Sequence, residues 1–164
     1  MTTTLKEEAD GYKSLGNEAF NQKDYKKSIE LYTRAISLYQ NNHIYYSNRS
    51  ASYAALAQWQ SAEEDARSCI EMKPSFAKGY ARLANAQRHG GKEKEALLTL
   101  EEGKKVDSTS PDINALLREM TSNDKTKNTI APAIAAELSV LQPQYKSIVR
   151  ELEQVHIQYY SQWY

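Results

Sequence analysis

The pattern of apolar and polar positions along the chain predicts short helices arranged in pairs. Thr4 and Glu7 have the spacing of a capping box, so the first helix is predicted to begin near Leu5. Its apolar and aromatic positions follow helical spacing at Tyr12, Leu15, Ala19 and Phe20. A polar run over residues 21–24 interrupts this pattern, and a second helix is predicted over 25–39. Each unit is therefore expected to be two helices joined by a tight turn.

This unit recurs at a fixed step. Tyr46 lies 34 residues after Tyr12 and 34 before Tyr80, and the same step aligns three sets of small residues: Gly16, Ser50 and Ala84; Ser28, Ala62 and Ala96; Ala35, Cys69 and Gly103. A recurrence of this kind indicates a structural repeat. The second pair of helices is predicted at 43–57 and 59–72, and the third pair at 77–88 and 92–106. Pro111 begins a further helix after the third pair.

The last part of the chain has a different pattern. Residues 121–129 are polar and aperiodic, which predicts a linker, and residues 130–164 are predicted to form a helical extension. Its final helix carries an apolar stripe formed by Tyr145, Ile148, Leu152, Val155 and Tyr159. The stripe must pack either on the repeats or on a second copy of the chain, as a homodimer, and the sequence leaves both possibilities open.

Composition excludes several functional classes. The 164 residues suit one ordinary domain, and the 21 basic and 21 acidic side chains cancel, which argues against nucleic-acid or anionic-membrane binding. The single cysteine, Cys69, excludes an internal disulfide and is expected to be a buried thiol. The three histidines show no ligand spacing, so we expect no metal, no cofactor and no acid-base catalysis. Without an apolar run typical of a signal peptide or membrane span, we expect a cytoplasmic location.

The 34-residue helix-turn-helix unit, with small residues where helices cross, resembles the tetratricopeptide repeat (TPR) family. The resemblance covers residues 9–120, with repeats at about 9–42, 43–76 and 77–110, so that a domain over 1–120 is expected. It implies an all-α TPR solenoid of three helix-turn-helix repeats with a capping helix, followed here by the C-terminal helical segment. In this family the first helix of each pair lines a concave groove. The family's glycine survives only as Gly16 and its closing proline only as Pro74.

Polar residues on the first helices are therefore the candidates for binding. Lys13 and Asn17 are four residues apart, as are Lys78 and Arg82, so each pair shares a helical face. Asn48 lies on the first helix between them. Any one of these residues is most simply explained as an ordinary solvated side chain. Three cations and two amides in one groove, however, suit an anion with more than one carboxylate.

These five residues and the sequences around them, GNEAF, YSNRSASYA and KGYAR, are similar to the carboxylate clamp of co-chaperone TPR domains. The resemblance is closest to the first such domain of the Hsp-organising protein (stress-inducible phosphoprotein) family. It implies a non-enzymatic adaptor that binds the C-terminal Glu-Glu-Val-Asp tail of cytosolic heat-shock chaperones of the seventy- or ninety-kilodalton class. On this interpretation the terminal aspartate lies among the five clamp residues, and an apolar wall for the valine is formed by Phe20, Ala51 and Ala54.

Two alternatives to the adaptor function remain open. The same module occurs in this family fused to peptidyl-prolyl isomerase or protein phosphatase domains, so the chain could be a piece of a larger enzyme. The roughly 40 residues after the capping helix are too few for either catalytic domain. The third possibility is a scaffold that binds another protein segment through its outer face.

Overall fold

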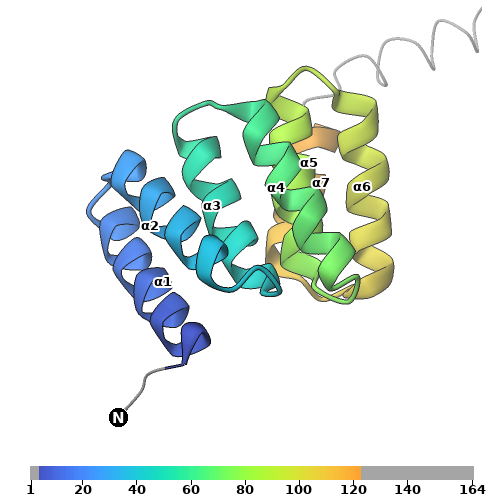
Figure 1. The fold of residues 1–164 in the computed structure, drawn as a ribbon. Coiled ribbons are helices and arrows are strands. Elements are labelled where there is room, and N and C mark those ends of the chain that lie inside the picture. The colour runs from blue at the N-terminus through green and yellow to red at the C-terminus, as the bar shows by residue number, and fades with distance from the viewer. Residues whose placement is uncertain (1–3, 123–164) are drawn as a thin grey trace, which may run out of the picture. The chain divides into compact units, whose positions relative to one another are not determined.

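The computed structural model describes residues 4–122, which form an all-helical arrangement (Figure 1). These residues belong almost entirely to the first of two compact units, Met1–Thr121. The helices are α1 (Leu5–Asn21), α2 (Tyr25–Leu38), α3 (His43–Ala55), α4 (Trp59–Met72), α5 (Ala77–His89), α6 (Glu93–Val106) and α7 (Pro111–Ser122). Helix α7 continues two residues into the segment predicted to be a linker, and the predicted extension over 130–164 lies outside the described residues.

Side-chain caps fix the starts of the first three helices. The predicted capping box is confirmed: Glu7 N–H donates to Thr4 Oγ1 at 3.2 Å, and Thr4 N–H donates to Glu7 Oε2 at 2.8 Å. Asp24 caps α2 by accepting from the Lys27 N–H, and Asn42 caps α3 by accepting from the Ile44 N–H. Each cap pairs a backbone donor that the helix itself leaves without a partner.

The turn inside each helix pair contains one residue in the left-handed region. These residues are Lys23, Ala57 and Gly91, with φ values of 63°, 56° and 82°, and they follow one another at the 34-residue step. Helix α3 ends at Ala55, two residues earlier than predicted, because a residue with positive φ cannot continue a right-handed helix. Only the third turn has the glycine that this conformation favours.

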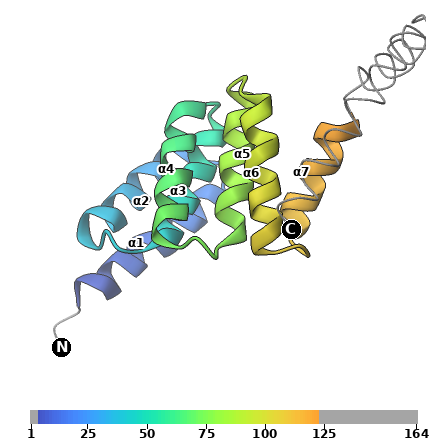
Figure 2. The ribbon, with the colours of Figure 1, turned by 90° about the vertical axis from the view of Figure 1, so that its right-hand side faces the viewer.

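The helices pack in antiparallel pairs, α1 with α2, α3 with α4 and α5 with α6 (Figures 1 and 2). Among the described residues, α3 also contacts α1 and α5, whereas no such contact joins α2 to α4 or α4 to α6. The first helices of the pairs therefore form one layer and lie closer together than the second helices. This layer carries all the candidate binding residues.

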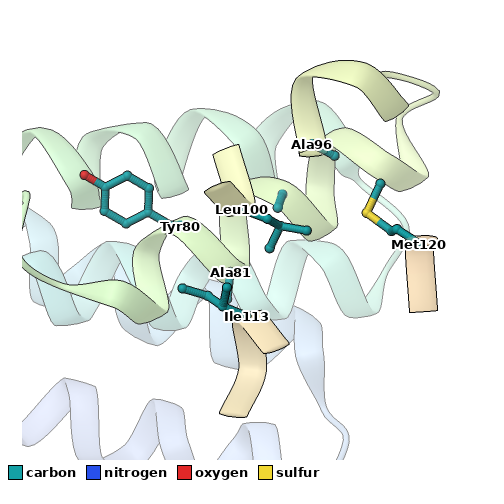
Figure 3. Packing of buried hydrophobic residues seen from close by; sticks show 7 residues of the cluster. Tyr80, Ala81, Ala96, Leu100, Ile113 and Met120 are labelled. Carbon is teal, nitrogen blue, oxygen red and sulfur yellow. The ribbon is translucent and has the colours of Figure 1, made fainter. Parts of the chain in front are cut away.

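Small residues occupy the helix crossings, as the repeat predicts. All nine residues of the three aligned sets are buried. A Cβ atom added to Gly103, for example, would lie 2.7 Å from both Ile113 Cδ1 and Tyr80 Cβ. Helix α7 covers the end of the last pair, because its Ile113 and Met120 belong to one buried cluster with Tyr80, Ala96 and Leu100; in Figure 3 Ile113 lies beside Ala81 and Leu100, and Met120 lies on the side of Ala96. The predicted capping helix is thus confirmed.

Candidate functional site

A pocket of about 310 Å³ opens on the layer of first helices. Its lining comes from α1, α2, α3 and α5 and consists of Asn17, Phe20, Asn21, Tyr32, Asn48, Ala51, Lys78 and Arg82. Six of the eight residues that the sequence pointed to are therefore brought together, although they are spread over 66 positions of the chain, from 17 to 82. The other two, Lys13 and Ala54, are not among the lining residues.

The two cations of the pocket, Lys78 and Arg82, form no ion pair among the described residues, although Asp112 interacts electrostatically with Arg82. Arg82 is half-buried, and its Nε atom is buried without a hydrogen-bond partner. Burial lowers the pKa of the Arg82 guanidinium from its ordinary value, yet arginine stays protonated at neutral pH. The pocket therefore carries positive charge that an anion can neutralise.

The amide oxygen of Asn17 is engaged by two neighbouring side chains. This Oδ1 atom accepts two hydrogen bonds, from the Tyr32 hydroxyl at 2.7 Å and from Asn48 Nδ2 at 3.0 Å. With the oxygen engaged in this way, the NH₂ group of Asn17 finds no acceptor in the described part of the chain and is free to donate to a ligand. The polar groups offered to a ligand by Asn17, Lys78 and Arg82 are thus all donors.

One side of the pocket is apolar. Phe20 is half-buried and packs edge-on against Tyr25, with ring centroids 5.3 Å apart. Ala51 on α3 is 8% exposed and lies in the same lining. An aliphatic side chain next to a bound carboxylate can be buried against these two residues.

Lys13 is held on the surface of α1 by an acidic residue. Its Nζ donates to Asp10 Oδ1 at 3.0 Å, and the same oxygen accepts from the Tyr45 hydroxyl at 3.0 Å. The hydrogen bond from Lys13 is the main cause that lowers the pKa of Asp10. An anionic ligand must therefore share Lys13 with Asp10, a residue that the sequence reasoning did not consider.

Sequence reasoning missed Asn21 and Tyr32 as lining residues. Tyr32 comes from the second helix of a pair, whereas the candidate binding residues were all on first helices. The available indication was Gly16, whose missing side chain lets the Tyr32 ring approach: a Cβ there would lie 2.6 Å from Tyr32 Cε1. This contact brings the hydroxyl next to Asn17.

A second pocket, of about 450 Å³, lies at α4 and the turn between α5 and α6. Its buried carboxylate, Glu63, forms ion pairs with Arg67 at 2.7 Å and with Lys92 at 2.9 Å. Trp59 stacks on His89 at its edge, with ring centroids 4.7 Å apart. Glu63, Arg67 and Lys92 of this pocket are paired with one another, unlike Lys78 and Arg82 of the first pocket.

Other chemistry receives little support in residues 4–122. Cys69 is fully buried, and burial raises the pKa of its thiol to about 11, so that the thiol is protonated at neutral pH, as a core residue would be. The described residues contain no cluster of acidic, histidine or cysteine side chains that could hold a metal ion. No helix within them has the length and apolarity needed to cross a lipid bilayer.

The fold and the site together define a repeat protein of stacked helix pairs with a cationic pocket on its first helices. The chain belongs to the tetratricopeptide repeat family, and its repeats are homologous to those of STI1-type co-chaperones. The family profile, "Tetratricopeptide repeat", matches residues 9–42.

Two relatives illustrate the homology. Protein STIP1 homolog of Dictyostelium discoideum is 41% identical over 113 residues, which are 69% of this chain and 20% of the relative. Heat shock protein STI1 of Saccharomyces cerevisiae is 51% identical over 79 residues, which are 48% of this chain and 13% of the relative. The chain thus spans a fifth or less of these relatives. The yeast relative is a heat-shock protein by name, and the STI1-type homologues are non-enzymatic co-chaperones.

Three solved structures share the fold. The Sgt2 TPR domain from Aspergillus fumigatus is 34% identical, with a TM-score of 0.70 over 74% of this chain and 82% of that domain. The first TPR of Spaghetti (RPAP3), bound to the HSP90 peptide SRMEEVD, is 25% identical, with a TM-score of 0.67 over 74% of this chain and 94% of that domain. The TPR2B domain of yeast Sti1 in a pHsp70 complex is 29% identical, with a TM-score of 0.62 over 70% of this chain and 90% of that domain.

Proposed function

We propose that this chain is a co-chaperone adaptor that binds the C-terminal Glu-Glu-Val-Asp tail of cytosolic heat-shock chaperones. The observation that carries the proposal is the pocket in which Lys78 and Arg82 form no ion pair among the described residues and the Asn17 amide offers only donors. A terminal aspartate has two carboxylates, and each forms its strongest hydrogen bonds with charged donors. The solved relatives in complex with an HSP90 peptide or with pHsp70 support the same ligand class.

In the proposed complex, the two carboxylates of the terminal aspartate are bound by Lys13, Asn17, Asn48, Lys78 and Arg82. Asn48 uses one amide hydrogen for Asn17 and keeps the second for the ligand. The valine side chain packs on Phe20 and Ala51, with Ala54 extending this wall along α3. The repeats at about 9–42, 43–76 and 77–110 supply these residues. Because the proposed partner is a cytosolic chaperone, the proposed location of this protein is the cytoplasm.

The experiment is a calorimetric titration of the chain with two peptides ending in Glu-Glu-Val-Asp, one a free acid and the other a C-terminal amide. We expect about micromolar affinity for the free acid and much weaker binding of the amide, which has lost one carboxylate. Equal affinity for both peptides would exclude the proposal.

Matched variants locate the binding site. Asn48→Ala and Lys78→Ala should each weaken binding of the free acid roughly ten- to a hundredfold, because a hydrogen bond to a charged group contributes about 1.5–3 kcal/mol. Lys104→Ala removes an exposed lysine in the last turn of α6, a helix that contributes no residue to the pocket lining, and should leave binding unchanged. Normal binding by the Asn48 and Lys78 variants would instead favour recognition through another surface.

A further inference from the structure

We infer that Tyr32 is a positioning residue that makes the pocket selective for carboxylates, because its hydroxyl holds the Asn17 amide with the NH₂ group toward the ligand. The inference rests on the proposed function and adds to it a residue from outside the layer of first helices. Tyr32 acts through Asn17, so it is separate from the five side chains proposed to contact the terminal aspartate.

The geometry holds the hydroxyl in place. Tyr32 is 2% exposed, and its ring packs directly on Gly16, the residue that precedes Asn17. A side chain at position 16 would overlap the ring, since a Cβ would lie 2.6 Å from Cε1 and 2.8 Å from Cδ1. The ring therefore has little room to move, and its hydroxyl lies 2.7 Å from Asn17 Oδ1.

The hydroxyl matters because the two ends of an amide side chain have opposite hydrogen-bonding character. Asn17 Oδ1 accepts from Tyr32 and from Asn48 Nδ2. Rotating the amide by half a turn would place its NH₂ group against Asn48 Nδ2, which can only donate, would require the Tyr32 hydroxyl to turn from donor to acceptor, and would expose the oxygen to the ligand. An exposed oxygen would repel a carboxylate, whereas it would accept a hydrogen bond from a C-terminal amide.

Tyr32 remains a donor over the whole physiological pH range. Burial raises the pKa of its hydroxyl above the ordinary value of 10.0. The packing role of the residue needs only the ring, which phenylalanine also supplies. The hydroxyl is therefore the part of Tyr32 that the orientation of Asn17 depends on, and it can be removed separately.

The test is Tyr32→Phe in the full chain, titrated with the same two peptides, the Glu-Glu-Val-Asp free acid and its C-terminal amide. Losing one hydrogen bond that holds the amide should weaken binding of the free acid about three- to tenfold. Binding of the amidated peptide should fall less or not at all, because the released oxygen can now accept from it. The ratio of the two affinities, which a change in stability alone does not alter, is the decisive readout.

Tyr80→Phe is the matched control. Tyr80 is 8% exposed, and its hydroxyl donates to the Pro74 carbonyl at 3.1 Å, outside the pocket. This variant also loses one tyrosine hydrogen bond and should leave both affinities unchanged. Thermal midpoints of the two variants should be similar.

The outcomes separate the two proposals. If the unmodified chain prefers the free acid and Tyr32→Phe keeps the same affinity ratio, the positioning role is wrong and the proposed function stands. An equal loss of both affinities in Tyr32→Phe, together with a lower thermal midpoint than in Tyr80→Phe, would show that Tyr32 only supports packing. If the unmodified chain shows no preference for the free acid, both proposals fail.

Discussion

Replacing Arg82 should affect ligand binding and folding stability in opposite directions. Arg82 is half-buried, its Nε has no partner, and no carboxylate of the described residues forms an ion pair with it. Burying a donor or a charge without a partner costs free energy in the folded chain. A bound anion supplies the missing partner, so the same side chain is unfavourable in the free protein and favourable in the complex.

Arg82→Met keeps much of the side chain's length and removes its charge. Binding of the Glu-Glu-Val-Asp free acid should weaken by about 1.5–3 kcal/mol, or roughly ten- to a hundredfold, because one charge-assisted interaction is lost. The free chain should become more stable by about 0.5–1 kcal/mol, less than the full penalty of an unpaired buried donor because the pocket opens to water. For a domain of this size, the thermal midpoint should rise by about 2–5 °C.

Calorimetry measures both quantities on the same sample, by titration for the affinity and by heating without ligand for the thermal midpoint. Arg67→Met is the control with the opposite expectation. Arg67 lies away from the binding pocket and pairs with Glu63 at 2.7 Å, so its loss should lower stability slightly and leave binding unchanged. A fall in the thermal midpoint of Arg82→Met larger than that of Arg67→Met would refute the reasoning and make Arg82 a structural residue.

Three further predictions concern stability. Gly103→Ala should destabilise the chain by about 1–3 kcal/mol in a denaturant titration, because its Cβ would lie 2.7 Å from Ile113 and Tyr80. The control Gly11→Ala, whose Cβ would meet no atom of another part of the chain within 4 Å, should stabilise the chain by about 0.5–1 kcal/mol. A stabilising Gly103→Ala would contradict this packing. Ala57→Gly should raise the free energy of unfolding by about 0.5–1 kcal/mol, since Ala57 has a φ of 56°, and an unchanged or lower value would count against strain in this turn. Burial raises the pKa of Glu63, but its hydrogen bonds with Lys92 and Arg67 outweigh burial and lower the pKa overall from 4.5. The folded pKa is thus below the unfolded one, so these ion pairs stabilise the fold above about pH 4.5 and less as the pH falls through the folded pKa. Glu63→Gln should accordingly cost about 1 kcal/mol near pH 7 and progressively less below pH 4.5; a cost independent of pH would show that the carboxylate charge is not responsible.

Most of the fold could be predicted from the sequence because its determinants are local. The capping box at Thr4 and Glu7 fixes the start of α1, and Pro111 fixes the start of α7. The other predicted helix ends differ from the observed ones by two residues at most. The two-residue difference at the end of α3 arises at Ala57, because alanine gives no indication that its backbone is left-handed.

The candidate site was only partly predictable. Spacing of four residues places Lys78 and Arg82 on one helical face, and both line the pocket. Lys13 has the same relation to Asn17 but pairs with Asp10, since a long side chain on an open surface can reach an acidic residue one turn away. The helical face of a residue follows from its position in the sequence, whereas the partner that its side chain selects does not.

The sequence by itself determined the 34-residue repeat, the helix pairs, and the shared helical face of Lys78 and Arg82, since each depends on periodicity or on contacts within a few residues. Only the tertiary structure decided that the Arg82 Nε is buried without a partner and that Asn17 turns its NH₂ group outward. The second result depends on Tyr32 and Asn48, which lie 15 and 31 residues from Asn17 in the chain. Hydrogen bonds over such separations depend on how the helices pack, and the packing is set by the whole buried core.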